Sequence, residues 1–291
     1  MEARLQLRVQ RYGWDKAAPH YESYWSAQLR PAQDRLIQLA ALQPGERVLD
    51  VACGTGLVTF RAAAAVAPGG SVVATDISDE MVQHIRTTAA AKGLDHVSAQ
   101  RAHAEEAVGD AASFDAALCA LGLMYVPDPV AALREMRRVL KPAGRAVVAI
   151  WGARRNCGWA DIFPIVDSRV QSEVCPMFFQ QGTGDNLRTD MTAAGFTGIE
   201  VDRLSTVLDY ASADAALGAA FVGGPVAMAY SRFDQQMRTD AHAEYLQSIE
   251  RFRHGDGYGI PGEFVVARGG GRIETASRIA EPADPPPGCA I

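Results

Sequence analysis

The sequence has few cysteines and no group of histidines that suits a metal ion. Its five cysteines, Cys53, Cys119, Cys157, Cys175 and Cys289, are odd in number and widely spaced, so neither a disulfide framework nor a zinc site is indicated. The six histidines include no His-x-x-x-His or comparable ligand pair. We therefore predict no metal site.

Long apolar runs and basic stripes are also missing. The longest apolar stretch, Ala116 to Val126, is too short to span a bilayer, and Met1 to Arg4 begins no secretory signal. The 28 basic and 34 acidic residues give a formal charge of −6. This balance disfavours nucleic acid and anionic membranes as partners. We expect a cytoplasmic protein that acts on a small molecule.

The first half of the chain alternates predicted strands with helical patterns. The strands are predicted near 47–52, 71–75, 97–101, 114–119 and 145–151. Such alternation is typical of an α/β fold in which helices cover both faces of a mostly parallel, doubly wound sheet. Ligands of these sheets bind beyond the carboxyl ends of the strands.

Two carboxylates follow predicted strands at that edge. Val48 to Gly56 reads VLDVACGTG, which is an apolar strand that ends in a turn of small residues, with Asp50 near the end of the strand. Small residues allow the backbone to approach a ligand, and the helix that follows offers unpaired N–H groups. The next strand delivers Asp76, and a carboxylate at that position can accept hydrogen bonds from both hydroxyls of a ribose.

The spacing of the glycines distinguishes between the two kinds of nucleoside cofactor that such a turn could bind. A dinucleotide fingerprint needs a third glycine or alanine where this chain has Thr59. The run D-x-A-C-G-T-G instead resembles the first motif of class I S-adenosylmethionine-dependent methyltransferases, although Ala52 replaces the commoner glycine. Three further segments match that family in order: 76–81 (DISDEM), 101–105 (RAHAE) and 140–145 (LKPAGR). The match covers about residues 45–152 and is similar to the branch of ubiquinone and menaquinone methyltransferases.

The resemblance implies a Rossmann-like, seven-stranded sheet whose last strand is antiparallel, and S-adenosyl-L-methionine as the cofactor. The residues it places at the cofactor are Tyr21, Asp50, Ala52, Gly54, Gly56, Asp76, Ile77, Met81, His103, Ala104, Glu105 and Ala120. Three of these have alternatives. Tyr21 could instead be a hydrophobic anchor for the first helix. Asp50 could instead bond to loop amides and shape the site, and His103, where the family usually has Asp, could be a loop histidine without a ligand.

No motif marks a catalytic base. Whether a base is needed depends on the methyl acceptor. The candidates to examine near the site are His20, Tyr125 and Asp161. Aromatic residues in the 120–128 loop and at Trp151 suit the positively charged sulfur or a flat substrate ring. The apolar content favours a small or medium hydrophobic acceptor, such as an aromatic or polyketide-like compound. Two alternatives to methyl transfer stay open: a protein that binds the cofactor without catalysis, and a nicotinamide-dependent oxidoreductase.

The rest of the chain divides by pattern. We predict an N-terminal lid segment (1–30), a cofactor-binding core (31–152) and an irregular aromatic insertion on the substrate side (153–183). The end of the core sheet follows in two pieces (184–208 and 259–268), with a helical cap inserted between them (209–258). The chain closes with a flexible tail that is rich in Gly and Pro (269–291). The cap and the tail would each permit a homodimer.

Overall fold

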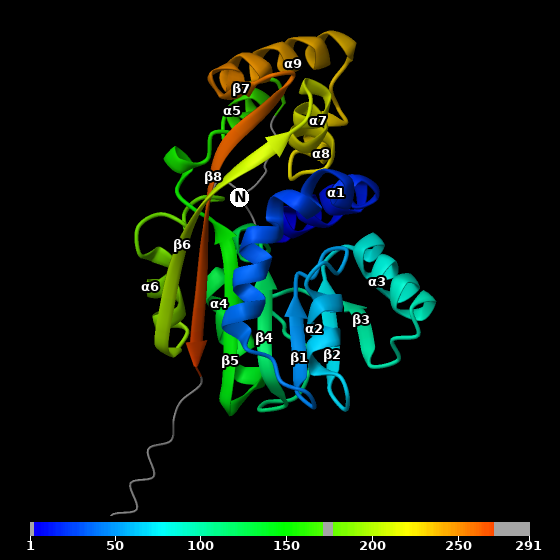
Figure 1. Cartoon of the computed structure of the whole chain (residues 1–291), viewed down its shortest axis with the longest axis vertical. Coiled ribbons are helices and arrows are strands. Elements are labelled where there is room, and N and C mark those ends of the chain that lie inside the picture. Colours follow the sequence, from blue (N-terminus) through cyan, green and yellow to red (C-terminus); the bar gives the residue numbers. More distant parts are fainter. Residues whose placement is uncertain (1–2, 171–176, 271–291) are drawn as a thin grey trace, which may run out of the picture.

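The computed structural model describes residues 3–170 and 177–270, and its centre is a twisted sheet with the strand order β3-β2-β1-β4-β5-β8-β6 (Figure 1). The strands are β1 (Arg47–Val51), β2 (Ser71–Asp76), β3 (Val97–Arg101), β4 (Phe114–Ala120), β5 (Leu140–Trp151), β6 (Thr197–Tyr210) and β8 (Gly257–Gly270). Strands β1 to β5 pair in parallel, and β8 is antiparallel to both β5 and β6. The predicted fold class is confirmed. A two-residue strand, β7 (Arg253–His254), adds an eighth member beside β8.

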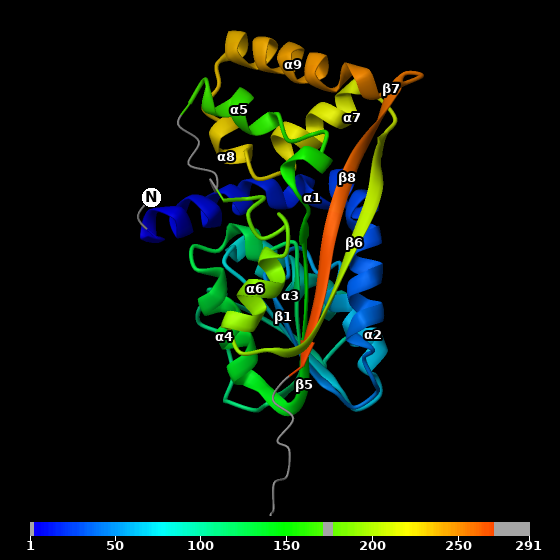
Figure 2. The ribbon, with the colours of Figure 1, turned by 90° about the vertical axis from the view of Figure 1, so that its left-hand side faces the viewer.

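Helices cover both faces of the sheet, and local sequence explains where they begin. α3 (Asp79–Ala91) starts at Ser78, whose hydroxyl accepts a hydrogen bond from the backbone N–H of Met81. α4 (Pro129–Val139) starts at Asp128 in the same way and has Pro129 in its first turn. α4 and α6 (Asn186–Ala193) lie on one side of the sheet, and α2 (Thr59–Val66) lies with part of α1 on the other (Figure 2).

The N-terminal helix is longer than the predicted lid segment. α1 runs from Ala3 to Ala40 without a break at residue 30, and it contains Pro19 and Pro31. Proline interrupts the hydrogen-bond ladder of a helix and bends it. Figure 1 shows the result: one limb of α1 crosses above the sheet and the other descends along it.

A second layer of helices lies beyond the carboxyl ends of the parallel strands (Figures 1 and 2). Between β6 and β8 it comprises α7 (Ala213–Leu217), the π-helix η3 (Gly218–Val222), α8 (Ala227–Tyr230), α9 (Gln235–Ile249) and η4 (Glu250–Phe252). The segment predicted as irregular contributes α5 (Ile162–Asp167), so that part of the prediction is wrong. The predicted tail also starts too early, because Gly269 and Gly270 pair with β5; residues 271–291 lie outside the described residues.

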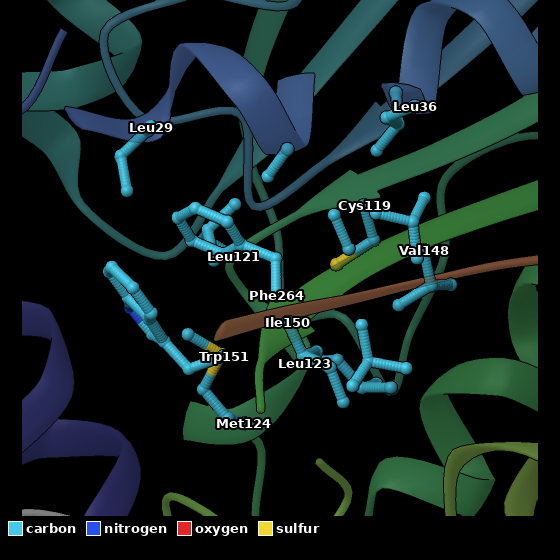
Figure 3. Close-up of a cluster of buried hydrophobic side chains, with 14 of the residues drawn as sticks. Leu29, Leu36, Cys119, Leu121, Leu123, Met124, Val148, Ile150, Trp151 and Phe264 are labelled. Atoms are coloured by element: carbon cyan, nitrogen blue, oxygen red, sulfur yellow. The ribbon is translucent and has the colours of Figure 1, made fainter. Parts of the chain in front are cut away.

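The largest hydrophobic core joins the sheet to α1. It contains Leu29 and Leu36 of α1 together with Val148 and Ile150 of β5 (Figure 3). Trp151, at the end of β5, stacks on Phe264 of β8 with ring centroids 4.2 Å apart. Burial on this scale fixes the carboxyl ends of β4, β5 and β8 relative to α1. Over the described ranges, no helix has both the length and the apolar character that a membrane crossing requires.

Candidate functional site

A cavity opens at the carboxyl ends of β1, β2 and β4, beneath the N-terminal limb of α1. We call it the main cavity. Ten of the twelve predicted cofactor residues line it: Tyr21, Ala52, Gly54, Asp76, Ile77, Met81, His103, Ala104, Glu105 and Ala120. Segments far apart in the sequence therefore converge at the edge of the sheet where parallel α/β folds bind ligands.

The turn after β1 has a left-handed backbone at three positions. The φ angles are 53° at Ala52, 55° at Gly54 and 96° at Gly56. Gly56, which was also predicted at the cofactor, is not among the residues that line the main cavity. A Cβ there would lie 2.7 Å from the ring of Phe60, so Gly56 is needed for the fold of the turn.

Asp76 holds this turn in place. Its Oδ2 accepts a hydrogen bond from the backbone N–H of Gly54 at 2.9 Å, and its Oδ1 accepts one from that of Ser78 at 2.9 Å. Burial raises the pKa of the Asp76 carboxyl, and these two bonds act against that rise. A carboxylate has about four acceptor sites, so Asp76 retains capacity for hydroxyl donors in the main cavity.

Asp50 is fully buried and borders a smaller space beside the main cavity. That space is also lined by Tyr21, Ala52, Gly54 and Ala120, which belong to the main cavity as well. The hydroxyl of Thr59 donates to Oδ2 of Asp50 at 2.6 Å.

The other carboxylate oxygen of Asp50, Oδ1, is buried and has no hydrogen-bond partner. Burial raises the pKa of Asp50 to about 7, and the nearby charge of Asp76 adds to the effect. An unpaired buried acceptor of this kind suits a cationic donor. The side chain of Asp50 is thus bonded to the first residue of α2, not to loop amides as the alternative held, and it also presents an unsatisfied oxygen.

The opposite wall comes from the loops after β3 and β4. His103 is half-buried, and its carbonyl accepts a hydrogen bond from the backbone N–H of Glu106. Gly122 lies directly against Ala52: a Cβ on Gly122 would be 2.3 Å from the methyl group of Ala52. The alanine at position 52, where the family commonly has glycine, is therefore accommodated by a glycine on the facing loop.

The roof of the main cavity was largely missed by sequence reasoning. Leu7, Gln10, Trp14 and Tyr21 of α1 line it, and only Tyr21 was predicted to do so. Their spacing of three, four and seven residues places them on one helical face. This helical periodicity was the feature of the sequence from which a shared face could have been predicted.

A side chain on the same limb ties the roof to the opposite rim. Asp15 Oδ1 accepts a hydrogen bond from the hydroxyl of Ser78 at 2.6 Å. It also accepts one from the backbone N–H of Glu80 at 3.3 Å. An ion pair between Arg11 and Asp79 adds a second tether. The N-terminal limb of α1 is thus fastened to the start of α3 across the cavity.

Of the three catalytic candidates, only Tyr125 reaches the main cavity. His20 is exposed on α1, outside the lining. Asp161 is exposed, lies 3.6 Å from Arg154 and borders a different surface hollow. The structure therefore does not bring His20 or Asp161 to the main cavity. Both were chosen for their chemistry alone, and the helical geometry of α1 and α5 carries them away from the site.

Residues 48–144 match the family model of the methyltransferase domain. This segment is a class I methyltransferase domain. The match supports S-adenosylmethionine as the cofactor of the domain, as predicted. The dinucleotide alternative has no support, since Thr59 is buried and its hydroxyl is used by Asp50.

The methyltransferase domain also aligns with curated relatives. A nocamycin O-methyltransferase of Saccharothrix syringae is 36% identical over 132 residues, which is 45% of this chain and 47% of the relative. The ubiquinone/menaquinone biosynthesis C-methyltransferase UbiE of Shewanella frigidimarina is 43% identical over 113 residues, which is 38% of this chain and 45% of that protein. The chain thus spans about half the length of the curated relatives it matches.

The fold likeness extends beyond the methyltransferase domain. The crystal structure of the YcgJ protein from Bacillus subtilis superposes with a TM-score of 0.57 at 19% identity, covering 84% of this chain and 99% of that one. At this identity the likeness concerns the fold alone.

Proposed function

We propose that the protein transfers a methyl group from S-adenosylmethionine to a small, hydrophobic acceptor. The observation that carries this proposal is the convergence of Asp76, the 52–56 turn and the 103–105 loop on one cavity within a methyltransferase domain. When bound, the cofactor would supply a methyl group carried by a sulfonium; an acceptor lone pair would bond to the methyl carbon in line with the breaking carbon–sulfur bond, and S-adenosylhomocysteine would leave.

The residues present fit this cofactor. We assign Asp76 to the ribose hydroxyls, because its carboxylate lines the main cavity and keeps free acceptor sites. We assign the unpaired Oδ1 of Asp50 to the ammonium group of the methionine part. The 103–105 loop lies on the adenine side, where the N–H of Ala104 and the His103 ring serve as donors or stacking partners.

The protein's own contribution is position and exclusion of water. The N-terminal limb of α1 acts as a lid, fastened by Asp15 to Ser78, and the inserted helices act as a cap. Holding two reactants in line can supply roughly 7 kcal/mol or more of the barrier. Next to the main cavity, under the inserted helices, lies a second cavity whose only ionisable lining residues, among those that the structure describes, are Tyr21 and Tyr125. Burial raises the pKa of Tyr21 well above its usual value. We therefore expect acceptors that need no strong base, such as an activated carbon or an acidic enol or phenol.

Transfer of labelled methyl from S-adenosylmethionine to a panel of small acceptors tests the proposal, with the product identified by its gain of one CH2 unit in mass. Turnover that depends on Asp76 supports it. Tight binding of S-adenosylhomocysteine without turnover on any acceptor would instead favour a protein that binds the cofactor and is catalytically silent.

A further inference from the structure

A second, smaller cavity adjoins the main cavity beneath the inserted helices. We call it the aromatic cavity. It shares Trp14, Tyr21, Leu121 and Tyr125 with the main cavity, so a molecule in one space touches the walls of the other. Under the proposed function, the aromatic cavity is the place beside the cofactor where an acceptor would lie.

Three tryptophans from separate elements form its inner wall. Trp25 comes from α1, Trp151 from the end of β5, and Trp159 from the segment before α5. Their ring centroids lie 4.8 to 6.3 Å apart, with interplanar angles of 63° to 71°. Edge-to-face contacts of this kind are favourable and fix the ring planes. The wall is thus preformed, apolar and flat-sided, which suits a planar ligand.

The aromatic cavity lacks charge. Within the part of the chain that the structure describes, its lining contains no Asp, Glu, Lys, Arg or His. Placing an ion there would remove it from water without a counter-charge. An uncharged ligand is therefore favoured.

Two polar atoms in this wall have no partner. The indole nitrogens of Trp25 and Trp159 are buried and make no hydrogen bond, and the two residues are only 7% and 5% exposed. Buried donors are normally paired. Both residues line the aromatic cavity, so a ligand oxygen that reached these nitrogens would satisfy them, whereas an ammonium group has no lone pair to accept their hydrogen bonds.

We propose that the aromatic cavity binds the methyl acceptor, an uncharged planar compound with carbonyl or ether oxygens that accept hydrogen bonds from Trp25 and Trp159. This inference rests on the proposed function. It adds the substrate class and two residues that select it.

The test uses three probes built on two fused six-membered rings: chromone, which has a carbonyl and a ring oxygen, naphthalene, which has neither, and the N-methylquinolinium cation. Each is titrated calorimetrically into the full chain saturated with S-adenosylhomocysteine. We expect chromone to bind tightest, by roughly two- to tenfold over naphthalene for each hydrogen bond formed.

The variants Trp25→Phe and Trp159→Phe keep an aromatic ring and remove one N–H each. In either variant the preference for chromone over naphthalene should fall by roughly two- to tenfold, while naphthalene affinity changes little. Naphthalene is the matched control within each variant, because it has no oxygen that could accept a hydrogen bond from either indole. Either tryptophan variant alone suffices if the other fails to fold.

Equal binding of chromone and naphthalene, or tightest binding of the cation, would overturn the inference. So would failure of all three probes to bind a protein that binds S-adenosylhomocysteine, and in that case the proposed function would stand. Failure to bind S-adenosylhomocysteine itself would instead remove the proposed function.

Discussion

Ligand binding at Asp50 should be coupled to a proton. In the protein without ligand, burial raises the pKa of Asp50 from its usual value near 3.9 to about 7. Ionisation of this carboxyl therefore costs the folded state stability as the pH rises from about 4 towards 7. A ligand ammonium beside Oδ1 favours the charged form and lowers that pKa, so binding of S-adenosylhomocysteine should release the proton.

The magnitude follows from the ionised fraction. With a pKa of about 7, roughly 3% of Asp50 is ionised at pH 5.5 and roughly three quarters at pH 7.5, so the affinity should rise roughly 25-fold over this range. At pH 6 about 0.9 proton should be released for each ligand bound. Calorimetry at several pH values, in buffers with different heats of ionisation, measures both quantities.

The control is Asp50→Asn, which keeps an oxygen that can accept the hydrogen bond from Thr59 but cannot ionise. This variant should bind S-adenosylhomocysteine weakly. Its binding should release no proton, and its affinity should not rise steeply with pH. An affinity that is independent of pH in the parent protein, or an equal pH slope in the variant, would refute the assignment of Asp50 to the ligand ammonium.

Three further changes test other contacts of the site. Gly122→Ala should lower the free energy of unfolding by about 1–3 kcal/mol, because the new Cβ would lie 2.3 Å from that of Ala52. Adding Ala52→Gly to the same chain should restore the stability. If the effects of the two substitutions on the free energy of unfolding, measured in denaturant melts, simply add, the contact is contradicted. Asp76→Asn should weaken S-adenosylhomocysteine binding at least about tenfold in calorimetry, because charged hydrogen bonds contribute about 1.5–3 kcal/mol; unchanged affinity in a folded variant would remove its ribose role. Asp15→Ala breaks the tether to Ser78, so stopped-flow release of the ligand should accelerate roughly three- to tenfold, and an unaltered rate would argue against a lid.

Much of the cofactor half could be predicted because its signals are local. The turn after β1 needs small residues with left-handed backbone, and Gly54 and Asp76 follow directly from strand ends. Gly56 shows the limit of that reasoning. A glycine in such a motif can serve the ligand or the turn, and only the packed position of Phe60 decides for the turn.

The acceptor side could not be predicted, since it is assembled by tertiary contacts. Trp25 and Trp159 are 134 positions apart in the sequence, and no pattern indicates that their rings meet at 6.3 Å. Gln10 reaches the main cavity only because α1 bends and crosses above the sheet. The helical periodicity of that limb predicts a shared face, but it does not say what the face covers.

The central claim is that the cavity at the carboxyl ends of β1, β2 and β4 binds S-adenosylmethionine. The most direct test is calorimetric titration of the purified protein with S-adenosylhomocysteine, with NAD and NADP titrated in parallel. The account predicts micromolar binding of S-adenosylhomocysteine and no binding of either dinucleotide. Binding of NAD or NADP in its place would contradict the reading of the glycine turn and the function built on it.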